Sequence, residues 1–88
     1  MENTTQRDAL RRLAYIEGHL AGVRRMIEQD QYCVDVLKQT YAVRRAIEKL
    51  EAKLLSGHLH GCVVDGIEAG EGDRVVDELL ELYALANK

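Results

Sequence analysis

Two residues in the second half of the chain, His58 and Cys62, have the types and spacing of metal ligands. They are four positions apart, so on a helix their side chains lie on the same face about one turn apart. A thiolate and an imidazole together favour Cu(I) or Zn(II) over ions that prefer oxygen ligands. Taken alone, the pair is as compatible with core packing or chance placement as with metal binding. The prediction therefore depends on a third ligand.

Cys33 is the third candidate ligand. It precedes His58 by 25 residues on the same expected helix, a separation of about 37 Å at 1.5 Å per residue. Cys33 therefore cannot share an ion with His58 of its own chain. In an antiparallel pair of these helices, Cys33 lies near the His58 and Cys62 of a second copy, and the two-fold axis passes near Ala46 and Ile47. Such a dimer has two identical Cys-His-Cys sites, each formed by both chains. Three soft ligands without a fourth suit trigonal Cu(I).

Helices are expected to position these ligands. In the first, apolar residues recur at helical spacing after Thr4 or Thr5, either of which is a suitable N-cap. Gly18 and Gly22 lie four residues apart on this helix. Because a helical glycine costs about 1 kcal/mol relative to alanine, we interpret the two glycines as a close-packing contact. The first helix is expected to end at a turn around Asp30-Gln31.

The second helix is expected to begin near Cys33 and to carry an apolar seam with a period near 3.5 as far as Cys62. Ser56-Gly57 is a candidate kink within it. The clearest break in the sequence is the glycine-rich segment from Gly66 to Gly72. After it, Asp73 is expected to cap a short third helix with apolar residues at helical spacing.

The composition agrees with an all-α protein that works as an oligomer. The chain has 88 residues, 47% of them apolar, and no Pro, Trp or Phe. A lone protomer of this length buries only about 60% of its unfolded surface, so we expect oligomerisation to bury the rest of the aliphatic side chains. No segment approaches the ~20 apolar residues of a membrane span, and the N-terminal segment lacks the apolar core of a signal peptide. We expect a single cytoplasmic domain, residues 1–88, in which two cysteines are typical of metal ligands or reactive thiols.

The charges are unevenly distributed along the chain, whose net charge is −3. Residues 1–64 contain ten Arg and Lys against eight Asp and Glu, whereas residues 65–88 contain two against seven. In the basic part, Arg45, Lys49 and Lys53 follow each other at intervals of four, and their mutual repulsion slightly destabilises an isolated helix. A polyanion relieves this repulsion, so we interpret the row as DNA-binding rather than as a solvated face. No helix-turn-helix or zinc-finger pattern is found. Contacts to phosphates and to DNA shape are therefore expected to dominate.

The stretch IEGHLAGVRRMIEQDQYCVDVLKQTYAVRRAIEKL, followed by HLHGC, closely resembles the CsoR-type copper-sensing repressors of the CsoR/RcnR family of bacterial metal-responsive regulators. The resemblance extends from Arg12 into the third expected helix, and its Tyr-Cys and His-x-x-x-Cys motifs are specific. It implies a three-helix protomer, a dimer in the form of an antiparallel four-helix bundle, and a tetramer made of two dimers. It also implies that the metal-free tetramer binds operator DNA as a repressor and that Cu(I) releases it.

The resemblance also implies roles for residues of the metal site. Cys33, His58 and Cys62 match the copper ligands of the family position by position. Tyr32 and Glu78 match a pair that connects the ligands to the third helix by hydrogen bonds, and such contacts orient a ligating imidazole. Zn(II), which accepts the same donor atoms, is expected as a non-cognate ligand.

For DNA, Arg12 and Lys49 match basic positions that contact the operator in this family. Ala52 stands where some relatives carry a further basic residue, and the neighbouring Lys53 is expected to replace it. Together with Arg45 of the basic row, the expected DNA-binding residues are Arg12, Arg45, Lys49 and Lys53.

Other functions require residues that can be checked in the sequence. Relatives that sense nickel or cobalt have an N-terminal His and a His in place of Cys62, and relatives that sense formaldehyde have an N-terminal Pro, none of which is present. Persulfide sensors keep both cysteines but lack the His, so His58 disfavours this class, although a thiol-reactive repressor remains the leading alternative. A helical copper-binding protein that does not bind DNA is a further alternative. A thiol enzyme would pair Cys62 with His58, but no feature indicates an oxyanion hole or a substrate pocket, and we do not expect an enzyme.

Overall fold

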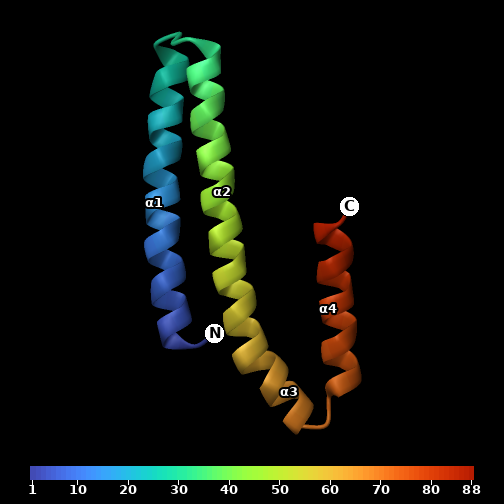
Figure 1. Cartoon of the computed structure of the whole chain (residues 1–88). Coiled ribbons are helices and arrows are strands. Elements are labelled where there is room, and N and C mark those ends of the chain that lie inside the picture. The colour runs from blue at the N-terminus through green and yellow to red at the C-terminus, as the bar shows by residue number, and fades with distance from the viewer.

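The computed structural model describes residues 1–88, and all of its regular structure is helical. Helices α1 (Asn3–Glu28) and α2 (Cys33–His58) form a long antiparallel hairpin (Figure 1). A π-helical turn, Leu59–Val63, follows α2 directly and leads into the short α3 (Val64–Glu68), after which the chain reverses into α4 (Gly72–Ala86). Because α2, the π turn and α3 are continuous, the predicted all-α protomer of three helical segments is confirmed.

The helix ends differ in detail from the predicted caps. The chain does turn at Asp30-Gln31, where Asp30 adopts a positive φ of 53°. At the start of α1, however, the cap is Glu2, whose carboxylate accepts a hydrogen bond from the Thr4 amide at 3.3 Å. At the start of α4, Glu71 occupies the capping position that was predicted for Asp73. Residue type alone predicted both caps wrongly. The Glu2 carboxylate reaches the Thr4 amide from before the helix, whereas Glu71 occupies its position without a side-chain hydrogen bond to the first turn and accepts hydrogen bonds from Arg74 instead.

The interior of the protomer is small. Five apolar side chains are buried: Ile16, Val23, Val43, Val63 and Val75. The first three form a cluster between α1 and α2, against which Val36, Ala46 and Leu50 are packed. No large side chain is fully buried. The protomer therefore has a thin seam of packed residues between two helices.

The predicted apolar seam of α2 is divided between two faces. Val36, Val43 and Leu50 pack toward α1 of the same chain, whereas Leu37 and Ile47 remain 47% and 37% exposed. A sequence period near 3.5 cannot distinguish two adjacent apolar faces from a single one, because both repeat at nearly the same interval. One face of α2 thus remains available for another chain.

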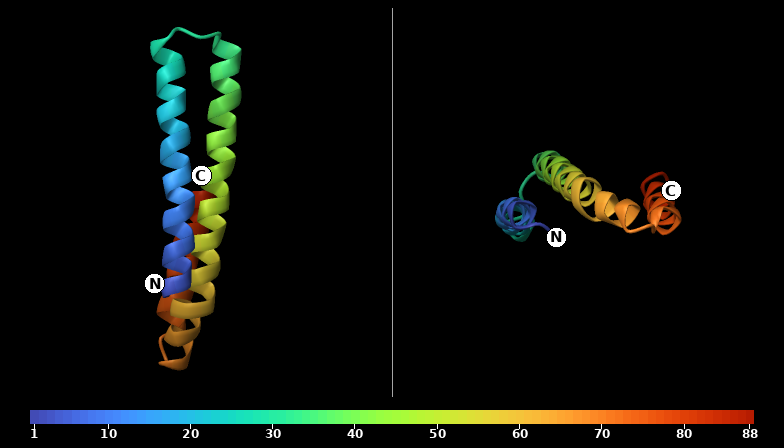
Figure 2. Two further views of the ribbon diagram at one scale, coloured as in Figure 1. Left: turned by 90° about the vertical axis from the view of Figure 1, so that its left-hand side faces the viewer. Right: turned by 90° about the horizontal axis from the view of Figure 1, so that it is seen from below.

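The protomer is flat and leaves much apolar surface uncovered. Its extents are 56 × 30 × 14 Å, and Figure 2 shows α1 and α2 side by side with α4 standing away from α1. Twenty large apolar side chains are exposed, among them Val76, Leu80 and Leu82 of α4. None of the helices combines the length and the apolar character that crossing a bilayer would need.

Two glycines allow close approach between helices. A Cβ atom on Gly57 of α2 would lie 2.5 Å from Cγ2 of Thr5, the buried residue near the start of α1. A Cβ atom on Gly66 of α3 would lie 2.5 Å from Cγ2 of Val75 on α4. These contacts position the first turn of α1 and the first turns of α4 against the continuous α2–α3 segment.

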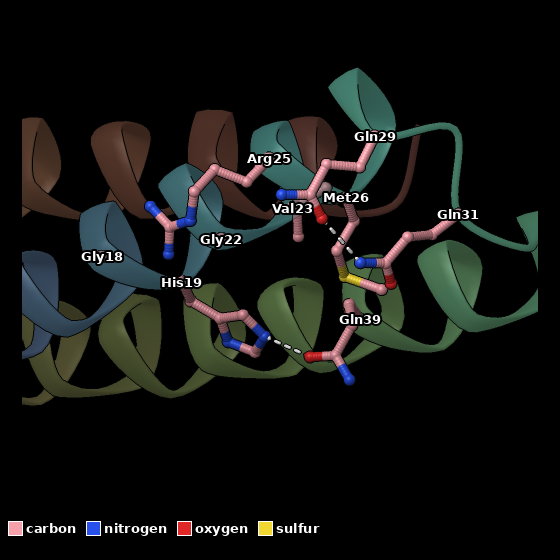
Figure 3. Close-up of a pocket in the computed structure, with 9 residues that line it drawn as sticks. All are labelled: Gly18, His19, Gly22, Val23, Arg25, Met26, Gln29, Gln31 and Gln39. Carbon is pink, nitrogen blue, oxygen red and sulfur yellow. Dashed lines mark hydrogen bonds between the residues drawn. The ribbon is translucent and has the colours of Figure 1, made fainter.

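The predicted close packing of Gly18 and Gly22 is wrong for the protomer. A Cβ atom on Gly18 would meet no atom within 4 Å, and one on Gly22 would meet only the Arg25 guanidinium at 3.7 Å. Both glycines instead line a polar groove between α1 and α2 near the hairpin turn (Figure 3). There His19 Nε2 lies 2.8 Å from the side-chain oxygen of Gln39, which connects the two helices by a hydrogen bond rather than by close backbone contact.

Candidate metal centre and basic groove

His58 and Cys62 lie on either side of a change in helix type. His58 is the last residue of α2, and Cys62 lies within the π turn. A π turn is wider than an α turn and carries i→i+5 hydrogen bonds, and such turns occur frequently at functional sites. The predicted irregularity at Ser56-Gly57 is therefore displaced by a few residues, because Gly57 is held in regular helix against Thr5.

Cys33 lies at the opposite end of α2. It is the first residue of the helix, and the preceding Tyr32 accepts hydrogen bonds on its carbonyl from the amides of Asp35 and Val36 at 3.0 and 3.2 Å. The 25 residues from Cys33 to His58 correspond to about 37 Å of α-helix, and Figure 1 shows the two ends of α2 far apart. Within one protomer no three His, Cys, Asp or Glu side chains converge as a metal site.

The three candidate ligands are accessible. Both cysteines are free thiols with exposed side chains, and His58 is half-buried. None of the three has a side-chain hydrogen-bond partner that would have to be displaced, in contrast to His60, whose Nδ1 lies 2.8 Å from the Ser56 carbonyl. The donor set is thus two thiols and one imidazole, divided between the two ends of a single helix.

Tyr32 and Glu78 are not brought together in one protomer. Tyr32 is 68% exposed at the hairpin end of α2, whereas α4, which carries Glu78, packs beside α3 at the other end (Figure 1). Glu78 forms an ion pair with Arg74 of the preceding turn, and Arg74 also pairs with Glu71. Glu71 first and Glu78 second raise the pKa of the Arg74 guanidinium. The Glu78 carboxylate is therefore partly neutralised by its own helix.

Three of the four predicted DNA-binding residues line one groove between α1 and α2, called here the basic groove. Its lining residues are Asp8, Arg11, Arg12 and Tyr15 of α1, and Ala42, Arg45, Ala46 and Lys49 of α2. The fourth, Lys53, lies one turn beyond Lys49, and its Nζ bonds Asp8 Oδ2 at 3.1 Å. The structure thus brings Arg12, Arg45 and Lys49 together and places Lys53 in an ion pair at the edge.

Sequence reasoning missed Asp8 as part of this groove. Asp8, Arg12 and Tyr15 follow the i, i+4, i+7 spacing of one helical face, which is the signal that could have identified it. Besides Lys53, Arg11 approaches Asp8 at 3.5 Å. The hydrogen bond from Lys53 is the main cause that lowers the pKa of the Asp8 carboxyl, so Asp8 is ionised at neutral pH.

Residues 5–84 match the family of metal-sensitive transcriptional repressors. The chain belongs to this family. Two curated relatives are called copper-sensing transcriptional repressor CsoR. The protein of Bacillus subtilis is 43% identical over 72 residues, which span 82% of this chain and 71% of that protein. The protein of Mycobacterium tuberculosis H37Rv is 41% identical over 76 residues, which span 86% of this chain and 64% of that protein.

A solved structure supports the same assignment. The copper-sensing repressor CsoR of Geobacillus thermodenitrificans, crystallised with Cu(I), superimposes with a TM-score of 0.94 at 31% identity, over 100% of this chain and 92% of that one. The family resemblance expected from the sequence is confirmed. As a metal-sensitive transcriptional repressor, the chain is a regulator and not an enzyme.

Proposed function

We propose that this chain is a Cu(I)-responsive repressor of the bacterial cytoplasm, which binds operator DNA without metal and leaves it when Cu(I) binds. The observation that carries this proposal is the placement of free, accessible Cys33 and Cys62, with His58, at the two ends of α2. The similarity to copper-sensing repressors, one of them crystallised with Cu(I), supports the choice of metal.

The donor set fits Cu(I). Two thiolates and one imidazole are soft ligands, which select Cu(I) from the ions of the cell, and bound Cu(I) would add positive charge and link the three side chains. Structural Zn(II) normally takes four ligands. Since only three are available here, Zn(II) is expected as a non-cognate ligand.

The site requires two chains. Cys33 of one copy reaches His58 and Cys62 of another only when the two α2 helices run antiparallel, with the two-fold axis near Ala46 and Ile47. Leu37 and Ile47 are exposed on the face of α2 that is not used by α1, and this face would pack in such a dimer. The remaining apolar surface, including that of α4, supports a further association of dimers into a tetramer.

DNA contact is assigned to the basic groove. Arg12, Arg45 and Lys49 line it together, and Lys53 lies at its edge. The groove offers guanidinium and ammonium groups rather than a protruding recognition helix. We therefore expect phosphate contacts that release counterions and depend strongly on salt, with sequence preference arising from DNA shape.

The experiment that tests the site mixes two variants. Cys33→Ala chains and His58→Ala/Cys62→Ala chains each lack ligands for every site in their homodimers, whereas a heterodimer has one intact site and one without any ligand. Copper titration of the purified heterodimer should give half the wild-type stoichiometry, measured with a Cu(I) chelator in competition. His60→Ala, which removes a histidine bonded to Ser56, is the matched control and should bind at full stoichiometry. Full copper binding by either mutant homodimer would show that the ligand assignment is wrong.

A second function, a thiol-reactive repressor, is favoured by the exposure of both cysteines. The two functions differ in their need for the imidazole. In DNA-binding titrations, a copper-responsive repressor loses its response to Cu(I) when His58 is replaced by Ala. A repressor whose inducer is a persulfide donor keeps its response in the same variant, since only the two thiols react.

A further inference from the structure

The basic groove contains a single acidic residue, Asp8. Its other charged lining residues are Arg11, Arg12, Arg45 and Lys49. Asp8 projects from α1 and is only partly exposed, with 29% of its side-chain surface accessible. A surface that binds phosphates would be expected to exclude a carboxylate, because like charges repel at short range.

Asp8 is the centre of an ion-pair cluster. Its Oδ2 accepts a hydrogen bond from Lys53 Nζ of α2 at 3.1 Å, and its Oδ1 lies 3.5 Å from Arg11 Nη1 of α1. Lys53 is itself partly covered, with 37% of its side-chain surface accessible. Arg11, in contrast, keeps 77% of its side-chain surface accessible. One cation at the groove edge, Lys53, is therefore already occupied by an anion of the same chain.

A carboxylate held in this way resembles a phosphate oxygen. Both are anionic oxygen acceptors for Lys and Arg, and both give charge-assisted hydrogen bonds. DNA can therefore engage Lys53 fully only by displacing Asp8, and Asp8 would then face the phosphates as a like charge that has lost its closest partner. Ion pairs at a protein surface contribute little to stability, so the fold alone does not account for this acid in the groove.

We propose that Asp8 is an internal competitor of DNA phosphate, which holds Lys53 in the metal-free protein and so limits its affinity for DNA. This inference rests on the proposed function of the basic groove. The consequence of this inference concerns the release of DNA when copper binds. Allosteric coupling typically changes affinity by about 5–150-fold, so a metal-free complex that is too tight would remain bound after copper is added. Asp8 keeps the affinity within the range that such coupling can reverse.

The test replaces Asp8 by Asn, which is close in size and removes the charge. Binding is measured by fluorescence anisotropy on a 40-bp duplex selected from a random library by the metal-free wild type, and on an unrelated duplex. Each additional phosphate contact steepens the slope of log K against log salt concentration by about 0.9. At 0.1 M salt this corresponds to a gain in affinity of up to about eightfold. We expect Asp8→Asn to tighten binding by up to about eightfold on both duplexes, because phosphate contacts carry no sequence information. The salt dependence should become steeper.

The matched control is Asp30→Asn, which changes the net charge equally at the hairpin turn. Asn tolerates the positive φ of this position as Asp does. If Asp30→Asn tightens binding as much as Asp8→Asn, a general charge effect explains the result and the inference is wrong. A folded Asp8→Asn variant with unchanged or weaker DNA binding would also overturn it, since Asp8 would then position Lys53 for DNA.

A second comparison does not require the Asp8 variant to be stable. In the wild-type background, Lys53→Gln should weaken binding less than twofold, because Lys53 is held by Asp8, whereas Lys49→Gln should weaken it by up to about eightfold. Equal losses of DNA affinity in Lys53→Gln and Lys49→Gln would contradict the inference. In the Asp8→Asn background, Lys53→Gln should abolish the gain in affinity for DNA. A double-mutant cycle measures this coupling between Asp8 and Lys53. If the wild type itself binds neither duplex, the proposed function fails and the inference fails with it.

Discussion

At the scale of single residues, the contact between Thr5 and Gly57 joins the first turn of α1 to the last turns of α2. Thr5 is buried although its neighbours on α1 are exposed, and its hydroxyl donates to the Glu2 carboxylate at 3.3 Å. Gly57 fits beneath it because it has no Cβ. One contact thus keeps α1, which carries Arg11 and Arg12 of the basic groove, close to the helix that ends at His58.

Replacing Gly57 by Ala should therefore destabilise the protein. The new methyl would lie 2.5 Å from Thr5 Cγ2, and overpacking of this kind costs about 1–3 kcal/mol. Urea unfolding at a fixed protein concentration measures the change. Gly18→Ala is the control, because a Cβ there meets nothing within 4 Å and alanine favours the helix by up to about 1 kcal/mol. Equal effects of the two substitutions would show that the contact with Thr5 is not tight.

The sequence predicts the residues of the candidate site better than it predicts their contacts. Cys33, His58 and Cys62 stand out because few residue types bind soft metals. Asp8 does not stand out, since an acid four residues from a base is ordinary on a helix surface. Its position in the basic groove depends on Lys53, 45 residues later, and only the packing of α1 on α2 places the two side chains together.

At the scale of helices, α4 is the segment best placed to sense changes at the ligands. It follows the π turn and α3 directly, and Gly66 and Val75 connect it to α3. Glu78 lies on α4 in an ion pair with Arg74. We propose that closure of Cys33 onto His58 and Cys62 of a second copy moves the π turn, and that Tyr32 and Glu78 transmit this movement to α4.

This relay separates metal affinity from DNA release. Glu78→Ala and Tyr32→Phe leave all three ligands in place, so both variants should bind Cu(I) tightly yet remain on the operator duplex when copper is added. Chelator competition and anisotropy measure the two properties. Glu81→Ala, which removes an exposed acid of the same helix, should release DNA as the wild type does. Normal release by both Glu78→Ala and Tyr32→Phe would exclude the relay and leave ligand closure alone to drive the switch.

Helix order and type were predictable because three long apolar patterns are separated by a turn and a glycine-rich break. The π turn was not, because no residue type is specific for it and its sequence LHGCV is also compatible with an α-helix. The division of the apolar seam of α2 between two faces was equally unpredictable from the sequence. Ile47 and Val43 differ only in which helix they face, and that depends on the hairpin and on a second chain.

At the scale of the whole molecule, the protomer has too little interior to be stable alone. Its smallest extent is 14 Å, little more than the 10–12 Å diameter of a helix, and no large side chain is fully buried. Most of the burial that stabilises a domain must therefore come from other copies of the chain.

Stability should consequently depend on protein concentration. If folding and dimerisation are coupled, each tenfold increase in concentration adds about 1.4 kcal/mol to the free energy of unfolding per dimer, which raises Tm by about 4 °C for a dimer of this size. Calorimetry over a hundredfold range measures the shift. Ile47→Asp, at the proposed axis but outside the α1–α2 cluster, should lower Tm and promote dissociation. A Tm independent of concentration would mean that the protomer folds alone.

The π turn has a consequence for how far the chain can change in length. A π turn accommodates one residue more than the α-helix around it, and each residue of an α-helix advances the direction of its side chains by about 100°. Because the wider turn absorbs this residue locally, deleting one residue from Leu59–Val63 would restore an uninterrupted α-helix and leave Gly66 facing Val75. Deleting a residue from the regular helix before the turn would instead rotate everything after it by about 100°, and α4 would leave on another side of the molecule. The π turn is therefore the place in this continuous segment where the loss of one residue disturbs the direction of the C-terminal helix least.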